Sequence, residues 1–460
     1  MTSEPKKQLK PITNKLLWIF AIGQFGWSLL SGVVSNWMVY YYTGSPDAQN
    51  PNTGLFAAGI TQEPILFKLT LFGLVLALGR IFDAITDPLI AGWSDRCTNK
   101  GGRRIPFMRV MAIPFSLCMV GLFTLPQTSN IVLNDTILFV LLMVFYLFMT
   151  MFCTPYNALI AELGDTQQHR INVSTYISFT FIVGQSLSFM LPNLAGALEG
   201  AVGQQNSIRF AVAIMAAIAC VAMLIPAFYI KERDYIDSKP SVTKPFSSLI
   251  KTFSNGQFRR FVCSDVIYFF ALTLFQTGLA FYETKLMGIE DTWTFVLTAT
   301  MTAISVALYP VVNILAKKIG KKKLIIIGFF AYCVVFLITA LCGQGLVFGF
   351  LVAGSAAIPM AILGILPQAC VADIAELTRL ETGEDRSGMF FAARTFAFKM
   401  GQALAMVVFT SLTVSGEAKS YRTTAWVAFV TCMVGACIFF LFNEKGILKR
   451  IGELKGTDEI

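Results

Sequence analysis

Two aspartates four residues apart interrupt an apolar stretch of the chain. Asp83 and Asp87 lie in the segment LGRIFDAITDPLIAGWSD, where a helix would place both carboxylates on one face. Like charges so close repel each other, and the repulsion is relieved if they share a hard cation through their oxygens or if one takes up a proton. Thr86 adds a neutral oxygen beside them. The spacing therefore predicts an ion-binding site, with a purely structural ion pair to Arg80 as the alternative.

A second isolated charge lies far along the chain, in the apolar segment FFAARTFAFKMGQ. A lone ammonium in an apolar helix must find a carboxylate or lose its proton, so we interpret Lys399 as the countercharge to Asp83 and Asp87. The alternative is that its amine reaches an interface. Asp265 and Arg394 are further charges in apolar segments. They either pair with each other, or Arg394 meets an acidic substrate.

The elements that must position these residues are expected to be membrane-spanning helices. The chain of 460 residues is 55% hydrophobic and 14% charged, where soluble proteins average roughly 25% charged residues. A soluble fold could not hide that much apolar surface. Apolar runs of about 20 residues or more, long enough to cross roughly 30 Å of hydrocarbon, lie near residues 16–42, 66–94, 107–126, 132–160, 172–198, 208–230, 258–282, 292–316, 323–343, 346–374, 388–414 and 422–442.

Lysine and arginine concentrate in alternate loops between these twelve runs, at the N-terminus and near residues 96–109, 169–170, 231–260, 317–323, 379–386 and 445–455. The other loops, such as TGSPDAQNPNTG, are nearly free of them. Basic loops stay in the cytoplasm, so both termini are predicted to be cytoplasmic. The formal charge of +9 is thus a topology signal and no nucleic-acid footprint. The ten cysteines show neither metal-site spacing nor a disulfide framework.

The longest basic stretch, residues 231–257, is predicted to be a cytoplasmic middle loop between an N-terminal bundle, 1–230, and a C-terminal bundle, 258–460. The halves repeat each other, since GWSDRCTNKGGRR is matched by AKKIGKKK, and ALIAELGDTQQHR by VADIAELTRLETGEDR. Parallel repeats related by an axis along the membrane normal are typical of major facilitators. We therefore expect an all-α major facilitator fold of twelve transmembrane helices in two six-helix bundles.

Three strings resemble the glycoside-pentoside-hexuronide:cation symporter family of the major facilitator superfamily: GRIFDAITDPLIAGWSDR, MVYYYTG, and VADIAEL followed by RTFAFKMGQ. The resemblance covers all twelve spans. It implies that Asp83 and Asp87 bind the coupling Na⁺, Li⁺ or H⁺, that Thr150 joins them, and that Lys399 links the two halves near this site. Thr86 stands where the family has an asparagine, which leaves the ion preference open.

The substrate side departs from the sugar-binding pattern of that family. Galactoside-binding members have aspartates where this chain has Ser28 and Cys153, and an aromatic residue where it has Asn157, so a galactoside specificity is not carried over. Polar or charged residues on several spans remain to line a cavity, although each would otherwise hydrogen-bond a neighbouring helix. They are Gln24, Ser28, Tyr156, Asn157, Tyr176, Asp265, Gln276, Arg394 and Thr395.

Other charges are predicted to be mechanical. The loop after the second span resembles the cytoplasmic loop signature of major facilitators, and a related position exists in the second half. Pairs between the two would hold the cytoplasmic side shut in the outward-open state and break on inward opening. The residues of this predicted cytoplasmic gate are Asp95, Arg96, Arg103, Arg104, Asp373, Glu376 and Arg386.

Together these features predict a monomeric multi-pass protein of the cytoplasmic (inner) membrane, surrounded by lipid. Its expected function is symport of a sugar, glycoside or sugar acid, coupled to Na⁺ or H⁺, by alternating access. No cofactor besides the coupling ion and no nucleic-acid partner are expected. One alternative is a non-sugar solute such as a lysolipid, which a relative of the family in animals moves; another is a solute sensor without net flux. No nucleophile with a base, metal cluster or phosphate loop supports an enzyme.

Overall fold

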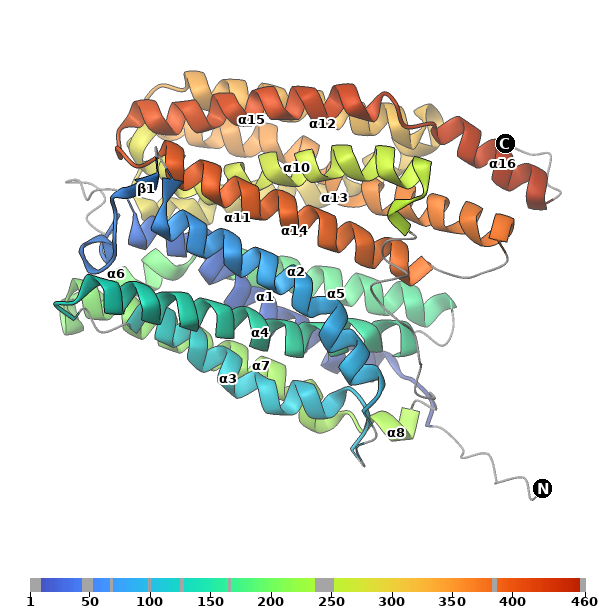
Figure 1. Cartoon of the computed structure of the whole chain (residues 1–460), viewed down its shortest axis with the longest axis horizontal. Helices are drawn as coiled ribbons and strands as arrows, with labels where there is room; N and C mark the ends of the chain where they lie inside the picture. The colour runs from blue at the N-terminus through green and yellow to red at the C-terminus, as the bar shows by residue number, and fades with distance from the viewer. Residues whose placement is uncertain are drawn as a thin grey trace. The chain divides into compact units, whose positions relative to one another are not determined.

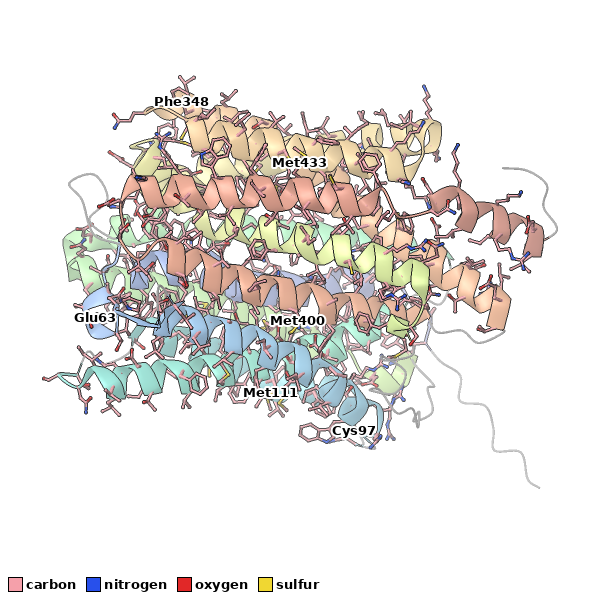
Figure 2. The ribbon with its side chains drawn as sticks, turned by 45° about the horizontal axis from the view of Figure 1, so that its top comes forward. Glu63, Cys97, Met111, Phe348, Met400 and Met433 are labelled. Carbon is pink, nitrogen blue, oxygen red and sulfur yellow. The ribbon has the colours of Figure 1, made fainter. Side chains whose placement is uncertain are left out.

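The computed structural model describes residues 10–43, 53–66, 69–97, 99, 101–124, 128–163, 167–235, 252–382 and 387–455. Figure 1 shows long helices joined by short connections, and the predicted all-α fold is confirmed. Figure 2 shows that side chains fill the spaces between the ribbons of each part. Apolar runs become helices here because a helix satisfies all its backbone hydrogen bonds internally, which hydrocarbon requires.

The elements of the first half of the chain are α1 (Asn14–Tyr42), η1 (Ala57–Gly59), β1 (Pro64–Leu66), β2 (Leu69–Thr70), α2 (Leu71–Asp95), α3 (Ile105–Thr124), α4 (Ile131–Leu163), α5 (Gln167–Ser188), α6 (Leu191–Val202), α7 (Gln204–Tyr229) and α8 (Glu232–Tyr235). The strands β1 and β2 form an antiparallel pair directly before α2. The second half consists of α10 (Gly256–Phe281), η2 (Tyr282–Leu286), η3 (Asp291–Trp293), α11 (Thr294–Ile319), α12 (Lys321–Leu341), α13 (Leu346–Thr382), α14 (Ser387–Leu412), α15 (Ala418–Phe439) and α16 (Glu444–Lys455).

Each predicted apolar run contains a long helix, with one interruption. The run near 172–198 is divided, because α5 ends at Ser188 and α6 begins at Leu191 with a bend of 41°. Among the described residues, 10 helices are long and apolar enough to cross a membrane, or 11 if this bent pair is one span. The helix α2 is not among them, since its central turns carry Arg80, Asp83 and Asp87. The number of crossings and the side of the termini stay predictions.

The chain divides into two compact units. The first comprises Met1–Ser35, Ile85–Pro126 and Ile137–Thr243, and the second comprises Asn36–Ala84, Gln127–Thr136 and Lys244–Ile460. The helix α2 therefore passes from the second unit into the first near its middle. The predicted division at residues 231–257 stays a prediction, and residues 236–251 lie outside the described part of the chain.

The first unit contains α3 and α6 packed against α7. A remote carboxylate organises the start of α3, since Glu232 accepts hydrogen bonds from the backbone N–H groups of Arg103 at 2.9 Å, Arg104 at 2.8 Å and Ile105 at 3.0 Å. These are groups that a helix N-terminus leaves without an intrahelical partner. Gly102, with φ of 118°, lies so close to Glu232 that a side chain there would clash with it.

The second unit repeats this arrangement at α12. Glu444, at the start of α16, accepts hydrogen bonds from the backbone N–H groups of Lys321 at 2.9 Å and Lys322 at 2.8 Å. Gly320 precedes α12 with φ of 89°, as Gly102 precedes α3. The internal repeat seen in the loop sequences thus extends to a carboxylate that follows the last long helix of each half.

The end of α1 and the first half of α2 also belong to the second unit. The Tyr40 ring lies 5.2 Å from the Phe281 ring of α10. Further along, α2 approaches α14 so closely that a Cβ atom at Gly73 would clash with the Thr410 hydroxyl. Elsewhere in this unit α10 packs against α14 and α15, and α12 against α13 and α15.

The carboxylate cap of α12 predicts a measurable contribution to stability. Replacing Glu444 with alanine leaves two half-buried N–H groups unpaired, which we expect to lower the free energy of unfolding by about 1–3 kcal/mol. Glu453 lies on the same helix, α16, and its side chain is 46% exposed. We therefore expect Glu453→Ala to change the free energy of unfolding by no more than about 0.5 kcal/mol. Thermal unfolding in detergent would measure both, and equal shifts would contradict the capping role.

Candidate functional site

The Asp83 carboxylate lies in the second unit, in an ion pair with Lys399. Lys399 Nζ of α14 is 2.8 Å from Asp83 Oδ2, and the two side chains are 12% and 1% exposed. At such burial the attraction between opposite charges is strong, but taking both from water is costly. Lys399 thus occupies the place on Asp83 that a free cation would need. Arg80 lies half-buried one turn before Asp83.

The Asp87 carboxylate lies in the first unit and has a neutral hydrogen-bond donor. The Thr154 hydroxyl of α4 donates to Asp87 Oδ1 at 3.2 Å. Four residues earlier on the same face of α4, Thr150 accepts a hydrogen bond at 3.4 Å from the hydroxyl of Thr86. The structure therefore brings Thr86 and Thr150 together, while the expected contact of Thr150 with an ion at the two aspartates stays a prediction. Sequence reasoning missed Thr154, although its spacing of one turn from Thr150 was a usable signal.

Asp265 and Arg394 form a second buried pair in the second unit. Arg394 Nε and Nη2 donate to the two carboxylate oxygens at 2.7 Å and 3.0 Å. The guanidinium also lies 5.6 Å from the centre of the Phe269 ring and 6.0 Å from that of Phe261. Of the two alternatives that the sequence leaves open, the structure shows mutual pairing. An acidic substrate at Arg394 would have to displace Asp265.

Three candidate substrate residues form hydrogen bonds within the first unit. The Ser28 hydroxyl donates to the Phe25 carbonyl at 3.0 Å. The Tyr156 hydroxyl donates to the Phe20 carbonyl at 2.8 Å, and the rings of these two residues are stacked. Gln24 is buried and accepts from the Trp27 indole at 3.1 Å. These contacts give each of the three residues a role in packing.

Other candidates present accessible groups. Asn157 on α4 of the first unit and Gln276 on α10 of the second unit are exposed, and neither amide has a hydrogen-bond partner among the described residues. Tyr176 is half-buried, with its ring stacked 4.2 Å from that of Trp18. The Thr395 hydroxyl donates to the Phe391 carbonyl at 3.0 Å. Amides exposed on otherwise apolar helices have unused capacity to bind hydroxyl groups of a solute.

The predicted gate residues form contacts inside single units. In the second unit Asp373 pairs with Lys321, and Glu376 pairs with Arg379 one turn along α13 at 2.8 Å. In the first unit the backbone N–H groups of Arg103 and Arg104 bind Glu232, as described above, and Arg96 is exposed. Asp95 is the last residue of α2, and its side chain is not among the described ones. Arg386 lies outside the described residues. The proposed closing pairs between halves therefore stay a prediction.

Residues 19–442 match the model of a family described as MFS/sugar transport protein. The chain belongs to this family. It is accordingly a major facilitator transporter and an integral protein of the cell membrane. An uncharacterized symporter of Synechocystis is 34% identical over 151 residues, which are 29% of this chain and 28% of that relative.

Longer matches are more distant. A lactose permease of Leuconostoc lactis is 24% identical, covering 96% of this chain and 71% of the relative. A sodium-dependent lysophosphatidylcholine symporter of Danio rerio is 21% identical, covering 73% and 69%. Among solved structures, a D-xylose-proton symporter superposes with a TM-score of 0.67 over 93% of this chain and 97% of the other at 14% identity, which bears on the fold alone.

The Asp83–Lys399 pair predicts a characteristic mutational pattern. Lys399→Ala leaves a buried carboxylate without its countercharge, so the free energy of unfolding in Na⁺-free buffer should fall by about 3–5 kcal/mol. The double variant Asp83→Asn/Lys399→Ala removes both charges and should recover most of that loss. Unfolding of the wild-type protein, Asp83→Asn, Lys399→Ala and the double variant in detergent measures the coupling energy between the two side chains. Simple additivity of the two single effects would show that the side chains do not interact.

Proposed function

We propose that this protein is a cation-coupled symporter of a sugar, glycoside or sugar acid, with Asp83 and Asp87 binding the coupling Na⁺ or H⁺. The observation that carries this proposal is the surroundings of these two carboxylates. Lys399 Nζ lies 2.8 Å from Asp83 Oδ2, and Asp87 accepts a hydrogen bond from the Thr154 hydroxyl. Two carboxylates one helical turn apart repel each other, and a bound monovalent cation relieves that repulsion.

In the proposed mechanism the ion and Lys399 compete for Asp83. A cation that binds the Asp83 carboxylate neutralises its charge. The ammonium of Lys399 is then no longer attracted to Asp83 and binds another partner. Thr86, Thr150 and Thr154 would supply neutral oxygens next to the carboxylates. If ion binding raises the affinity for the solute by some factor, the solute must raise the affinity for the ion by the same factor.

Two observations support a polyhydroxylated solute. A relative that aligns with 96% of this chain is a lactose permease. The exposed amides of Asn157 and Gln276 offer both donors and acceptors, which is what sugar hydroxyls require. The competing candidate is a lysolipid, which the name of the Danio rerio relative suggests. Uptake that lactose inhibits favours the first, and uptake that lysophosphatidylcholine alone inhibits favours the second.

Removal of either carboxylate should abolish coupling. We expect Asp83→Cys and Asp87→Cys to lose concentrative uptake in membrane vesicles, because each variant lacks one of the two carboxylates that hold the driving ion, while the protein still folds and inserts. The measurement is uptake of labelled lactose and lysophosphatidylcholine with and without Na⁺ at fixed pH. Asp234→Asn, which changes a partly exposed carboxylate paired with Lys10, is the matched control and should transport normally. Unchanged gradient-driven uptake in both cysteine variants would refute the mechanism.

The close approach of α2 to α14 at Gly73 predicts that a larger side chain at this position slows transport. A valine at position 73 would clash with Thr410, so the arrangement described here should be disfavoured and alternative states of the transport cycle should gain population. We expect uptake by Gly73→Val to fall at least about tenfold, with a changed rate of alkylation at the natural cysteine Cys263. Gly73→Ala/Thr410→Ala makes room and should recover uptake relative to Gly73→Ala. No difference between those last two variants would contradict the steric explanation.

A further inference from the structure

A buried acid lies in the second unit, on an element that the proposed symport mechanism does not use. Glu283 is 3% exposed and belongs to η2, the short π-helical turn that follows α10. Its Oε2 atom is buried and has no hydrogen-bond partner among the described residues. An ionised carboxylate without a partner is among the most costly groups to bury in a protein. The side chain therefore requires a positive charge or a proton that the surrounding side chains do not supply.

Two threonine hydroxyls on the next helix have the same deficiency. Thr294 is fully buried and Thr298 is 5% exposed. Within the described chain, neither Oγ1 atom has a hydrogen-bond partner. The two residues lie one turn apart at the start of α11, and Thr294 interacts with the Glu283 carboxyl without reaching hydrogen-bond geometry. Three unsatisfied side-chain oxygens from two elements thus belong to one neighbourhood.

A small cavity lies at this place. It measures about 10 Å³ and is lined by Glu283 and Thr298 together with apolar side chains that include Leu279, Met301 and Val352. That volume holds about one water-sized species. No lysine or arginine lines it, since its remaining walls are apolar. The cavity therefore has room for a single small ion beside the carboxylate.

The backbone around Glu283 also favours a cation. The C-terminal end of a helix carries partial negative charge, and η2 continues α10 to its C-terminal end. Single π-helical turns occur frequently at functional sites. In other membrane transporters, helix ends and irregular backbone supply carbonyl oxygens to bound Na⁺. A carboxylate, two hydroxyls and a helix C-terminus together form a set of hard oxygen ligands with one negative charge.

We propose that Glu283, Thr294 and Thr298 form a second site for a monovalent metal cation of the size of Na⁺, separate from the carboxylates of α2. One positive charge neutralises Glu283, and the cation accepts lone pairs from the Glu283 and Thr298 oxygens that line the cavity, while Thr294 lies against the Glu283 carboxyl. A protonated Glu283 would donate its O–H to one threonine hydroxyl and accept from the other, so absence of Na⁺ binding is the result that would identify a proton in place of a cation.

The test is equilibrium binding of radioactive Na⁺ to the purified full-length protein in choline-balanced buffer at fixed pH. In the variant Asp83→Asn/Asp87→Asn both carboxylates of the proposed coupling site are absent, and we expect saturable binding of about one Na⁺ per chain to remain. Adding Glu283→Gln should weaken this binding at least about tenfold. Thr298→Val in the same background keeps the shape of the side chain, removes one oxygen, and should weaken binding as well.

Glu290→Gln is the matched control, because Glu290 is an exposed acid on the same connection and its substitution should leave binding unchanged. Should Glu283→Gln fail to fold, Thr298→Val still tests the site. Absence of saturable Na⁺ binding in Asp83→Asn/Asp87→Asn, or equal binding with and without the Glu283 and Thr298 substitutions, would overturn the proposal. Neither result bears on the symport mechanism, which is judged by uptake in the Asp83 and Asp87 variants.

Discussion

The constraint on which the rest of this structure depends is the cost of holding a charge in an apolar environment. In the second unit, two ion pairs compensate buried charges, and each pair joins two helices: Asp83 of α2 with Lys399 of α14, and Asp265 of α10 with Arg394 of α14. Each would leave a buried, uncompensated ion if one partner were withdrawn. The packing of these helices is therefore tied to the charge state of four side chains.

Much of the fold was predictable because length and apolarity are local properties. Runs of about 20 apolar residues can satisfy their backbone groups in lipid only as helices, so their positions follow from the sequence. The partner of Asp83 was also predictable, since lone charges in apolar segments are few and must find one another. The break between Ser188 and Leu191 was not, because the hydrophobic run continues across it and the bend depends on tertiary packing.

Residues whose role depends on contacts with distant parts of the chain were not predicted from the sequence. Glu232 and Glu444 lie in polar segments of ordinary composition, and their role becomes visible only where they meet the starts of α3 and α12. Thr154 and Glu283 are single residues whose neighbours come from other elements. Conversely, Ser28 and Tyr156 have the chemistry of solute ligands, but their hydroxyls donate to backbone carbonyls. Residue type limits what a position can do, while the partner decides what it does.

The helix α14 gives the proposed coupling a mechanical basis. It carries Lys399 and Arg394 five residues apart, and it is thereby fastened to α2 through Asp83 and to α10 through Asp265. In the proposed mechanism a cation competes only for Asp83, so its binding would release α14 from α2 and leave the tie to α10 intact. The Asp83–Lys399 pair would depend on the ion and the Asp265–Arg394 pair would not. Ion binding would therefore change which helices move with α14, and a local change of charge would become a conformational change.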